Sequence, residues 1–136
     1  MKLNLDSMIQ HLLEISKLAG DKILDVYDGD FDVTIKDDLS PLTDADRKSN
    51  QIITEKLELL YPEIPILSEE GEKIDFSDRK KWSLFWLIDP LDGTKEFVKR
   101  NGEFTVNIAL ISEGHPIAGV VYAPVSSTYW YGAKDI

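Results

Sequence analysis

Apolar and small residues recur every three to four positions near the start of the chain, which predicts a long amphipathic helix. The positions that carry this pattern are Ile9, Leu12, Leu13, Ser16, Ala19, Ile23 and Val26. We expect Asp6 or Ser7 to cap the start of this helix. Gly20 within it costs stability unless another backbone packs closely against it.

A second helical pattern runs from about Asp44 to Leu60, and Tyr61-Pro62 ends it because a residue before proline disfavours the helical conformation. The side chains expected to face inward are those of Ile52, Ile53, Leu57 and Leu60.

Short apolar runs indicate strands. Between the two helical patterns, Phe31, Val33 and Ile35 alternate as in a half-buried strand. Later strands are expected over residues 64–67, 83–88, 104–111, 117–122 and 128–131, with residues 113–116 as the turn between the third and fourth of these. The pattern therefore predicts an α+β fold, a layered α/β sandwich in which two long helices pack on a mostly antiparallel sheet.

Composition narrows the class of protein. At 136 residues the chain is one domain, long enough to bury a core. A net charge of −10 argues against nucleic-acid binding, for which a basic stripe is expected. The chain has no cysteine, no signal peptide and no membrane-length apolar segment, which agrees with a cytoplasmic protein.

Three acidic clusters stand at expected element ends, and each also has a purely structural explanation. Asp89 and Asp92 follow the strand of residues 83–88, Glu69 and Glu70 follow the strand of residues 64–67, and Asp44 and Asp46 begin the second helix. If the two strands are parallel, their ends lie side by side, and Glu69 or Glu70 approaches Asp89 and Asp92. Magnesium is the expected partner of such oxygens. For Asp44 and Asp46, the local sequence favours a role as helix cap or first-turn acid.

Thr94 opens a short helical pattern and is placed to cap it, while Asp92-Gly93 is a strong turn pair. A helix N-terminus has free N–H groups that suit a phosphate. Lys95, Lys99 and Arg100 follow closely, either to bind an anion or to occupy a solvated helix face. The two histidines, His11 and His115, are assigned structural or solvated positions, His115 within the turn of residues 113–116.

The segments Leu67-Ser68-Glu69-Glu70 and Trp86 to Thr94 resemble the metal-site signature of the inositol monophosphatase superfamily, whose members are magnesium-dependent, lithium-sensitive phosphatases. Residues 95–110 resemble one branch of it, the bacterial 3'(2'),5'-bisphosphate nucleotidases of the CysQ type. The resemblance implies hydrolysis of a phosphate monoester, with adenosine 3',5'-bisphosphate as the substrate and two or three Mg²⁺ ions as cofactor. It also implies the N-terminal half of an αβαβα fold, and it allows peripheral association with the inner membrane.

The resemblance also implies roles for single residues. The metal ligands would be Glu69, Asp89, the backbone carbonyl of Leu91 and Asp92, with Asp89 shared between two ions. The Thr94 hydroxyl, oriented by Asp46, would help Glu69 to position and deprotonate the attacking water. The substrate phosphate would meet the amides of Gly93 and Thr94, with Lys36 nearby, and Glu70 would lie behind the ligands.

Relatives in the superfamily are considerably longer, and their second domain supplies a further aspartate and most contacts to the nucleotide. We therefore expect residues 1–136 to be the N-terminal, metal-binding catalytic domain without the C-terminal domain, weakly active or inactive alone. We also expect it to form homo-oligomers through the exposed sheet. Two alternatives stay open: an inositol monophosphatase or sugar bisphosphatase, and a metal-binding or assembly module without catalysis.

Overall fold

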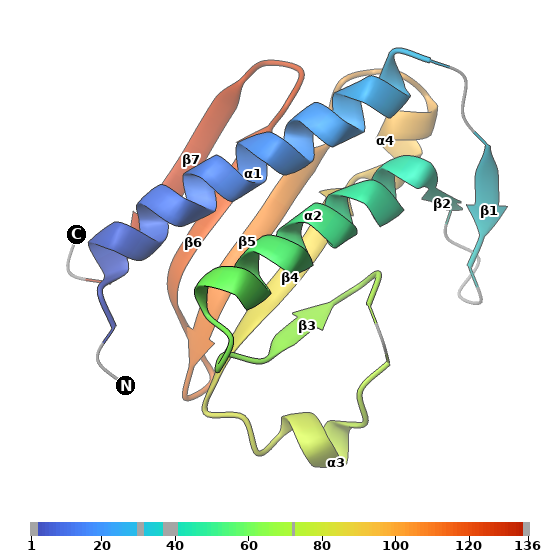
Figure 1. Cartoon of the computed structure of the whole chain (residues 1–136). Coiled ribbons are helices and arrows are strands. Elements are labelled where there is room, and N and C mark those ends of the chain that lie inside the picture. The colour runs from blue at the N-terminus through green and yellow to red at the C-terminus, as the bar shows by residue number, and fades with distance from the viewer. Residues whose placement is uncertain (1–2, 30–31, 37–40, 72, 135–136) are drawn as a thin grey trace.

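The computed structural model describes residues 3–29, 32–36, 41–71 and 73–134. Two long helices, two short ones and seven strands are present in this part of the chain (Figure 1). In chain order they are α1 (Leu5–Tyr27), β1 (Val33–Ile35), β2 (Pro41–Thr43), α2 (Asp44–Leu60), β3 (Ile66–Ser68), α3 (Phe76–Arg79), β4 (Leu84–Asp92), α4 (Thr94–Val98), β5 (Thr105–Ser112), β6 (His115–Ala123) and β7 (Thr128–Ala133).

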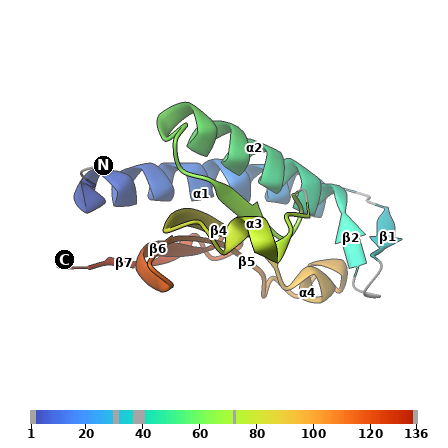
Figure 2. The same ribbon diagram turned by 90° about the horizontal axis from the view of Figure 1, so that it is seen from below.

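The main sheet has the strand order β3-β4-β5-β6-β7. Only β3 and β4 are parallel, and the other neighbours are antiparallel. Strands β1 and β2 form a separate antiparallel pair. Helices α1 and α2 lie together on one face of the main sheet (Figure 2). The predicted mostly antiparallel sheet under two long helices is confirmed.

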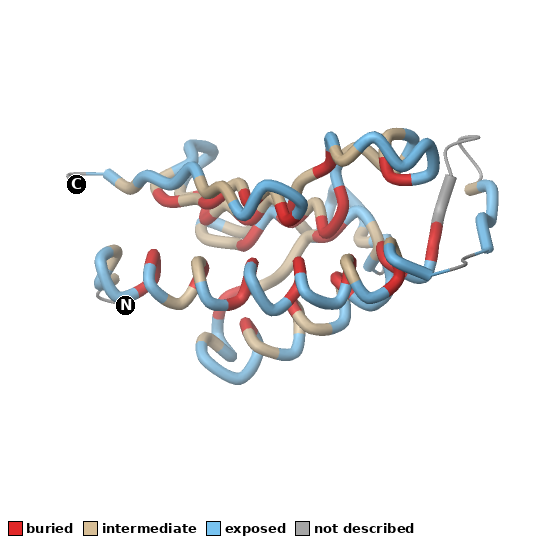
Figure 3. Tube along the Cα trace, turned by 90° about the horizontal axis from the view of Figure 1, so that it is seen from above, coloured by how far each residue is buried: buried red, intermediate tan, exposed pale blue. Residues whose placement is uncertain are grey.

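The hydrophobic core fills the space between the helices and the sheet, where Figure 3 shows the buried positions of both layers facing one another. Its largest fully buried side chains include Trp86, Tyr122, Phe97 and Phe104. Burial of this apolar surface stabilises the fold by roughly 25 cal/mol for each Å² removed from water.

Several local predictions are corrected. The cap of α1 is Asn4, whose side chain accepts a hydrogen bond from the Ser7 N–H at 3.0 Å, so neither Asp6 nor Ser7 caps the helix. Helix α2 has the predicted bounds, but Leu60 is 41% exposed and does not face inward.

The alternation at residues 31–35 does not mark a half-buried strand. Val33 and Ile35 are 42% and 60% exposed, because β1 pairs only with β2 and lies outside the main sheet. Phe31 lies outside the described residues. His115 is also placed differently. It begins β6, because the turn is the two-residue pair Glu113-Gly114 with left-handed φ angles of 49° and 79°.

Gly20 allows α1 to lie directly on the sheet. A Cβ at this position would lie 2.4 Å from a ring carbon of Tyr122 and 3.2 Å from Pro124. The close neighbour is thus a buried ring rather than the backbone that the sequence led us to expect. Tyr122 is 2% exposed and stacks on Tyr129, so its ring has little room to move away.

Gly20→Ala is therefore expected to destabilise the protein by about 1–3 kcal/mol through overpacking, although alanine is the better helix former. Urea unfolding followed by circular dichroism measures the change. Gly132→Ala is the matched control, because a Cβ there meets nothing within 4 Å. Equal stability of the two variants would contradict the packing argument.

Candidate metal and phosphate site

Parallel pairing of β3 and β4 places Glu69 beside Asp89. Ser68 is the register partner of Ile88, and the Glu69 N–H donates to the Ile88 carbonyl at 3.2 Å. Ser68 and Ile88 are buried under the helices. Because side chains alternate along a strand, Glu69 and Asp89 project from the opposite, outer face of the sheet.

A bulge in β4 brings Asp92 to the same face. Asp89 pairs with Asn107 and Asp92 with Thr105, so Pro90 and Leu91 together stand opposite a single residue of β5. Both are buried. Three positions along a regular strand would put the two aspartates on opposite faces, and the extra residue reverses this. The strand therefore continues to Asp92, beyond the end predicted at residue 88.

Asp89 is the electrostatic centre of the site. The pKa of its carboxyl is raised from 3.8 to about 7, first by burial and then by the charges of Glu69, Asp92 and Asp46, while a hydrogen bond from the Leu91 backbone opposes the shift. Its Oδ1 atom is buried and has no hydrogen-bond partner among the described residues. A buried carboxylate oxygen in this position is strongly unfavourable unless a cation or donor meets it.

The acidic side chains are neighbours but do not form a ready-made cage. Within the described part of the chain, no three Asp, Glu or His side chains are grouped closely enough to hold a metal ion as they stand. Glu69 and Asp92 are exposed, and Asp92 Oδ2 accepts a hydrogen bond from Asn107 Nδ2 at 3.1 Å. Mutual repulsion keeps such carboxylates apart, and the donor set of Asp89, its neighbours and nearby carbonyls fits a hard divalent cation.

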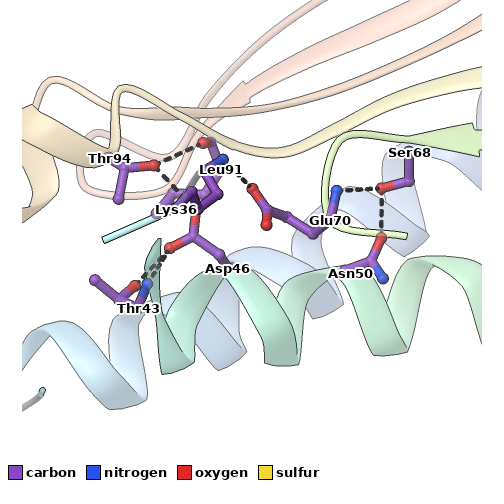
Figure 4. A network of polar contacts seen from close by, with 8 residues as sticks. All are labelled: Lys36, Thr43, Asp46, Asn50, Ser68, Glu70, Leu91 and Thr94. Atoms are coloured by element: carbon purple, nitrogen blue, oxygen red, sulfur yellow. Dashed lines mark hydrogen bonds and ion pairs between the residues drawn. The ribbon is translucent and has the colours of Figure 1, made fainter. Parts of the chain in front are cut away.

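The contact between Thr94 and Asp46 is present. The Thr94 hydroxyl donates to Asp46 Oδ1 at 3.0 Å and lies 3.3 Å from the Leu91 carbonyl oxygen (Figure 4). Asp46 Oδ2 accepts from the backbone and hydroxyl of Thr43, at 2.9 and 2.6 Å. Asp46 is fully buried, and these donors satisfy its carboxylate without a basic side chain. It is thus both a first-turn acid of α2 and the partner of Thr94.

One face of α2 contacts both segments of the site. Asp46, Ser49 and Asn50 share that face, because residues three and four apart are neighbours on a helix. The Ser49 hydroxyl donates to the carbonyl of Pro90, a residue of the bulge, at 2.6 Å. Asn50 Oδ1 accepts from the Ser68 hydroxyl at 2.5 Å, next to Glu69 (Figure 4). The helix thereby fixes the ends of β3 and β4 relative to each other.

Gly93 forms the sharp turn between β4 and α4. Its φ of 93° favours glycine, and a Cβ would lie 3.0 Å from the Glu103 carbonyl oxygen. Thr94 does not cap α4 as predicted: Gly93 is the cap residue, and Thr94 is the first helical residue, with its hydroxyl directed to Asp46. The first N–H groups of a helix have no carbonyl partner within it, so the amides of this turn are free of the helix ladder.

Basic side chains near the site have structural partners. Lys36 Nζ lies 2.9 Å from Glu70 Oε1, and the Glu70 side chain is only 7% exposed (Figure 4). Glu70 therefore faces Lys36, as expected for a residue that points away from Glu69. The Arg100 guanidinium donates to the carbonyls of Tyr27 and Gly29 at the end of α1. Arg100 thus anchors that helix end, whereas Lys95 and Lys99 are exposed.

A groove of about 880 Å³ lies on the outer face of the sheet, which neither long helix covers (Figure 2). Glu69, Asp89 and Asn107 line one part of it, and Val121 and Trp130 line another. The acids thus open onto a broad apolar surface.

Sequence reasoning missed Ser49, Asn50 and Asn107, because each is an ordinary polar residue until the fold gives it a partner. It also missed the bulge, for which one signal exists: a proline inside a strand pattern indicates a bulge or an edge.

Comparison with known proteins identifies the family of this chain. Residues 4–135 match the model of the inositol monophosphatase family. A 3'(2'),5'-bisphosphate nucleotidase CysQ of Salmonella typhimurium is 50% identical over 129 residues, which are 93% of this chain and 52% of that protein. The chain therefore spans about half the length of this curated relative. No helix of the described residues is long and apolar enough to cross a bilayer.

Solved structures agree. The crystal structure of CysQ from Bacteroides thetaiotaomicron is 42% identical with a TM-score of 0.82, over 98% of this chain and 48% of that one. An IMPase/NADP phosphatase solved with Mg²⁺ and phosphate has a TM-score of 0.83 over 96% and 49% of the two chains, and its 20% identity shows a shared fold alone. Family match, fold and close relatives agree, and the chain belongs to the inositol monophosphatase family.

Proposed function

We propose that this chain carries the metal-binding half of a magnesium-dependent phosphate monoesterase. The observation that supports this most directly is the buried Oδ1 of Asp89, which has no partner among the described residues and lies in the field of the Glu69 and Asp92 charges. Glu69, Asp89, the Leu91 carbonyl and Asp92 would hold two or three ions in the complete site. Mg²⁺, when bound, offsets the charge of the phosphate, acidifies water and supports the leaving alkoxide.

Thr94 and Asp46 would orient the attacking water. The ionised Asp46 carboxylate only accepts hydrogen bonds, so the Thr94 hydroxyl proton points to it. The lone pairs of the Thr94 oxygen are then free to accept a hydrogen bond from the attacking water. Glu69 supplies a second acceptor, and the water proton passes to its carboxylate.

The turn at Gly93 and Thr94 would bind the substrate phosphate through its backbone amides, since this geometry directs N–H groups to one point. Lys36 would add positive charge near the same place, and its contact with Glu70 orients it. Neither role needs a cysteine or serine nucleophile, and the chain has no cysteine.

Adenosine 3',5'-bisphosphate is the proposed substrate, because the Salmonella relative at 50% identity is named a bisphosphate nucleotidase. Residues 1–136 would then be the catalytic N-terminal domain, with low activity on its own and a tendency to form homo-oligomers. Inositol phosphates and sugar bisphosphates are the competing substrates, and comparing their turnover decides between them. A module that binds metal without catalysis is the outcome in which no substrate is hydrolysed.

Isothermal titration with Mn²⁺ or Mg²⁺ tests the metal site. We expect uptake by the wild-type chain and at least a 100-fold weaker affinity for Asp89→Asn, because the central ligand loses its charge. Asp78→Asn is the matched control, since it removes one exposed acid from α3, away from the site. Equal titrations for wild type and Asp89→Asn would refute the proposed site.

Phosphate release tests the chemistry. With Mg²⁺ and adenosine 3',5'-bisphosphate, Thr94→Val is expected to lower kcat about 100-fold, because the hydroxyl that orients the water is lost. Thr94→Ser keeps that hydroxyl and should retain most of the wild-type rate. If wild type and Asp89→Asn release phosphate equally, the release is not due to this site.

Stability without metal should depend on pH through Asp89. Because its folded pKa is raised, the folded state keeps a proton that the unfolded chain has lost between about pH 4 and pH 7. The free energy of unfolding should thus fall as pH rises through this window, by about 1–2 kcal/mol given the partial exposure of the carboxyl.

Urea unfolding in EDTA at several pH values measures this effect. Asp89→Asn should remove most of this dependence of the free energy of unfolding on pH, and at pH 7.5 it should be more stable than the wild type. Added Mg²⁺ at 100 times the wild-type Kd should raise the stability of the wild type by about 2.7 kcal/mol and that of Asp89→Asn by at most about 0.4 kcal/mol. A wild type that gains stability between pH 4 and pH 7 relative to Asp89→Asn would contradict the assignment.

A further inference from the structure

Asn107 contacts the site from β5, one strand away from the acidic residues. Its Nδ2 donates to Asp92 Oδ2 at 3.1 Å, and its Oδ1 accepts from the Thr105 hydroxyl at 2.9 Å. Thr105 and Asn107 lie two positions apart on β5, so both side chains project from the outer face with Asp92.

The amide of Asn107 has only one favourable orientation. An ionised Asp92 carboxylate accepts hydrogen bonds and donates none, so it requires the NH₂ end of the amide. The Thr105 hydroxyl then donates to the remaining oxygen. A flipped amide would point its carbonyl oxygen at the carboxylate and lose both favourable contacts.

Asn107 is the register partner of Asp89 as well, yet its amide bonds Asp92. Asp89 Oδ1 therefore has no donor among the described residues, whereas Oδ2 of Asp92 already accepts one hydrogen bond. This leaves Oδ1 of Asp92 as the oxygen available to a cation. A carboxylate held in this way binds through one oxygen and cannot easily chelate through two.

We propose that Asn107, oriented by Thr105, is a positioning residue that presents Asp92 to the metal as a one-oxygen ligand. This rests on the proposed metal site. Mg²⁺ and Mn²⁺ take octahedral oxygen sites, and Mg²⁺ tolerates little deviation from that geometry, whereas Ca²⁺ accepts more ligands and often chelates carboxylates through both oxygens. The contact therefore favours the smaller ions over Ca²⁺.

Calorimetric titration of the 136-residue chain with Mn²⁺ and, separately, with Ca²⁺ tests the proposal. Asn107→Ala should weaken Mn²⁺ binding about 10-fold and leave Ca²⁺ binding unchanged or tighter, because partners behind a ligand typically contribute 10–100-fold to metal affinity. Thr105→Val should shift the Mn²⁺ to Ca²⁺ preference in the same direction by about 3-fold, and Thr105→Ser should restore it.

Thr128→Val is the matched control, because the Thr128 hydroxyl donates to the Ser126 carbonyl and two strands separate β7 from β4 and its acids. Thermal unfolding in EDTA checks that every variant folds. If Asn107→Ala does not fold, Thr105→Val still tests the proposal. If Asn107→Ala loses Mn²⁺ and Ca²⁺ affinity equally, or loses neither, the proposed role of Asn107 is wrong but the metal site is not. A wild type that takes up no Mn²⁺ overturns the metal site, and this proposal with it.

Discussion

The extra residue in β4 is the constraint on which the acidic site depends. Pro90 and Leu91 both pack inward opposite one residue of β5, and this brings Asp89 and Asp92 to the same face of the sheet. Proline suits this place because it has no N–H to offer the strand ladder. Without the bulge, the strand period of two would bury one of the two carboxylates beneath α2.

Helix α2 makes the bulge rigid. Ser49 holds the bulge in place, because its side chain is fully buried and its hydroxyl donates to the Pro90 carbonyl. Asp46 and Asn50, on the same helix face, bind Thr94 and Ser68. Farther along that face, Ile53 and Leu57 are fully buried in the hydrophobic core. A single helix thus combines a polar half that orders two site segments with an apolar half that anchors it to the sheet.

The same arrangement stores electrostatic strain. Asp89 is half-buried beside like charges, which together raise its pKa to about 7, and its buried Oδ1 has no partner among the described residues. Such a group lowers the stability of the metal-free fold and gains most from a bound cation. By contrast, Asp46 is fully buried yet satisfied by hydrogen-bond donors, so it can serve as a fixed acceptor for Thr94. Asp89 and Asp46 therefore have different roles because their neighbours differ.

Local periodicity and the residue types at element ends were enough to predict the two long helices, most strands of the main sheet and the acidic segments, with the bounds of α2 as the structure has them. Helix α3 and strand β2 were not predicted, and the sequence left open whether β3 and β4 are parallel. Tertiary structure decided the rest. Only pairing across strands shows that Asp92 faces outward, that Asn107 binds it, and that Arg100 caps α1 rather than facing an anion. These contacts join residues distant along the chain, and no local pattern encodes which polar side chain will find which partner.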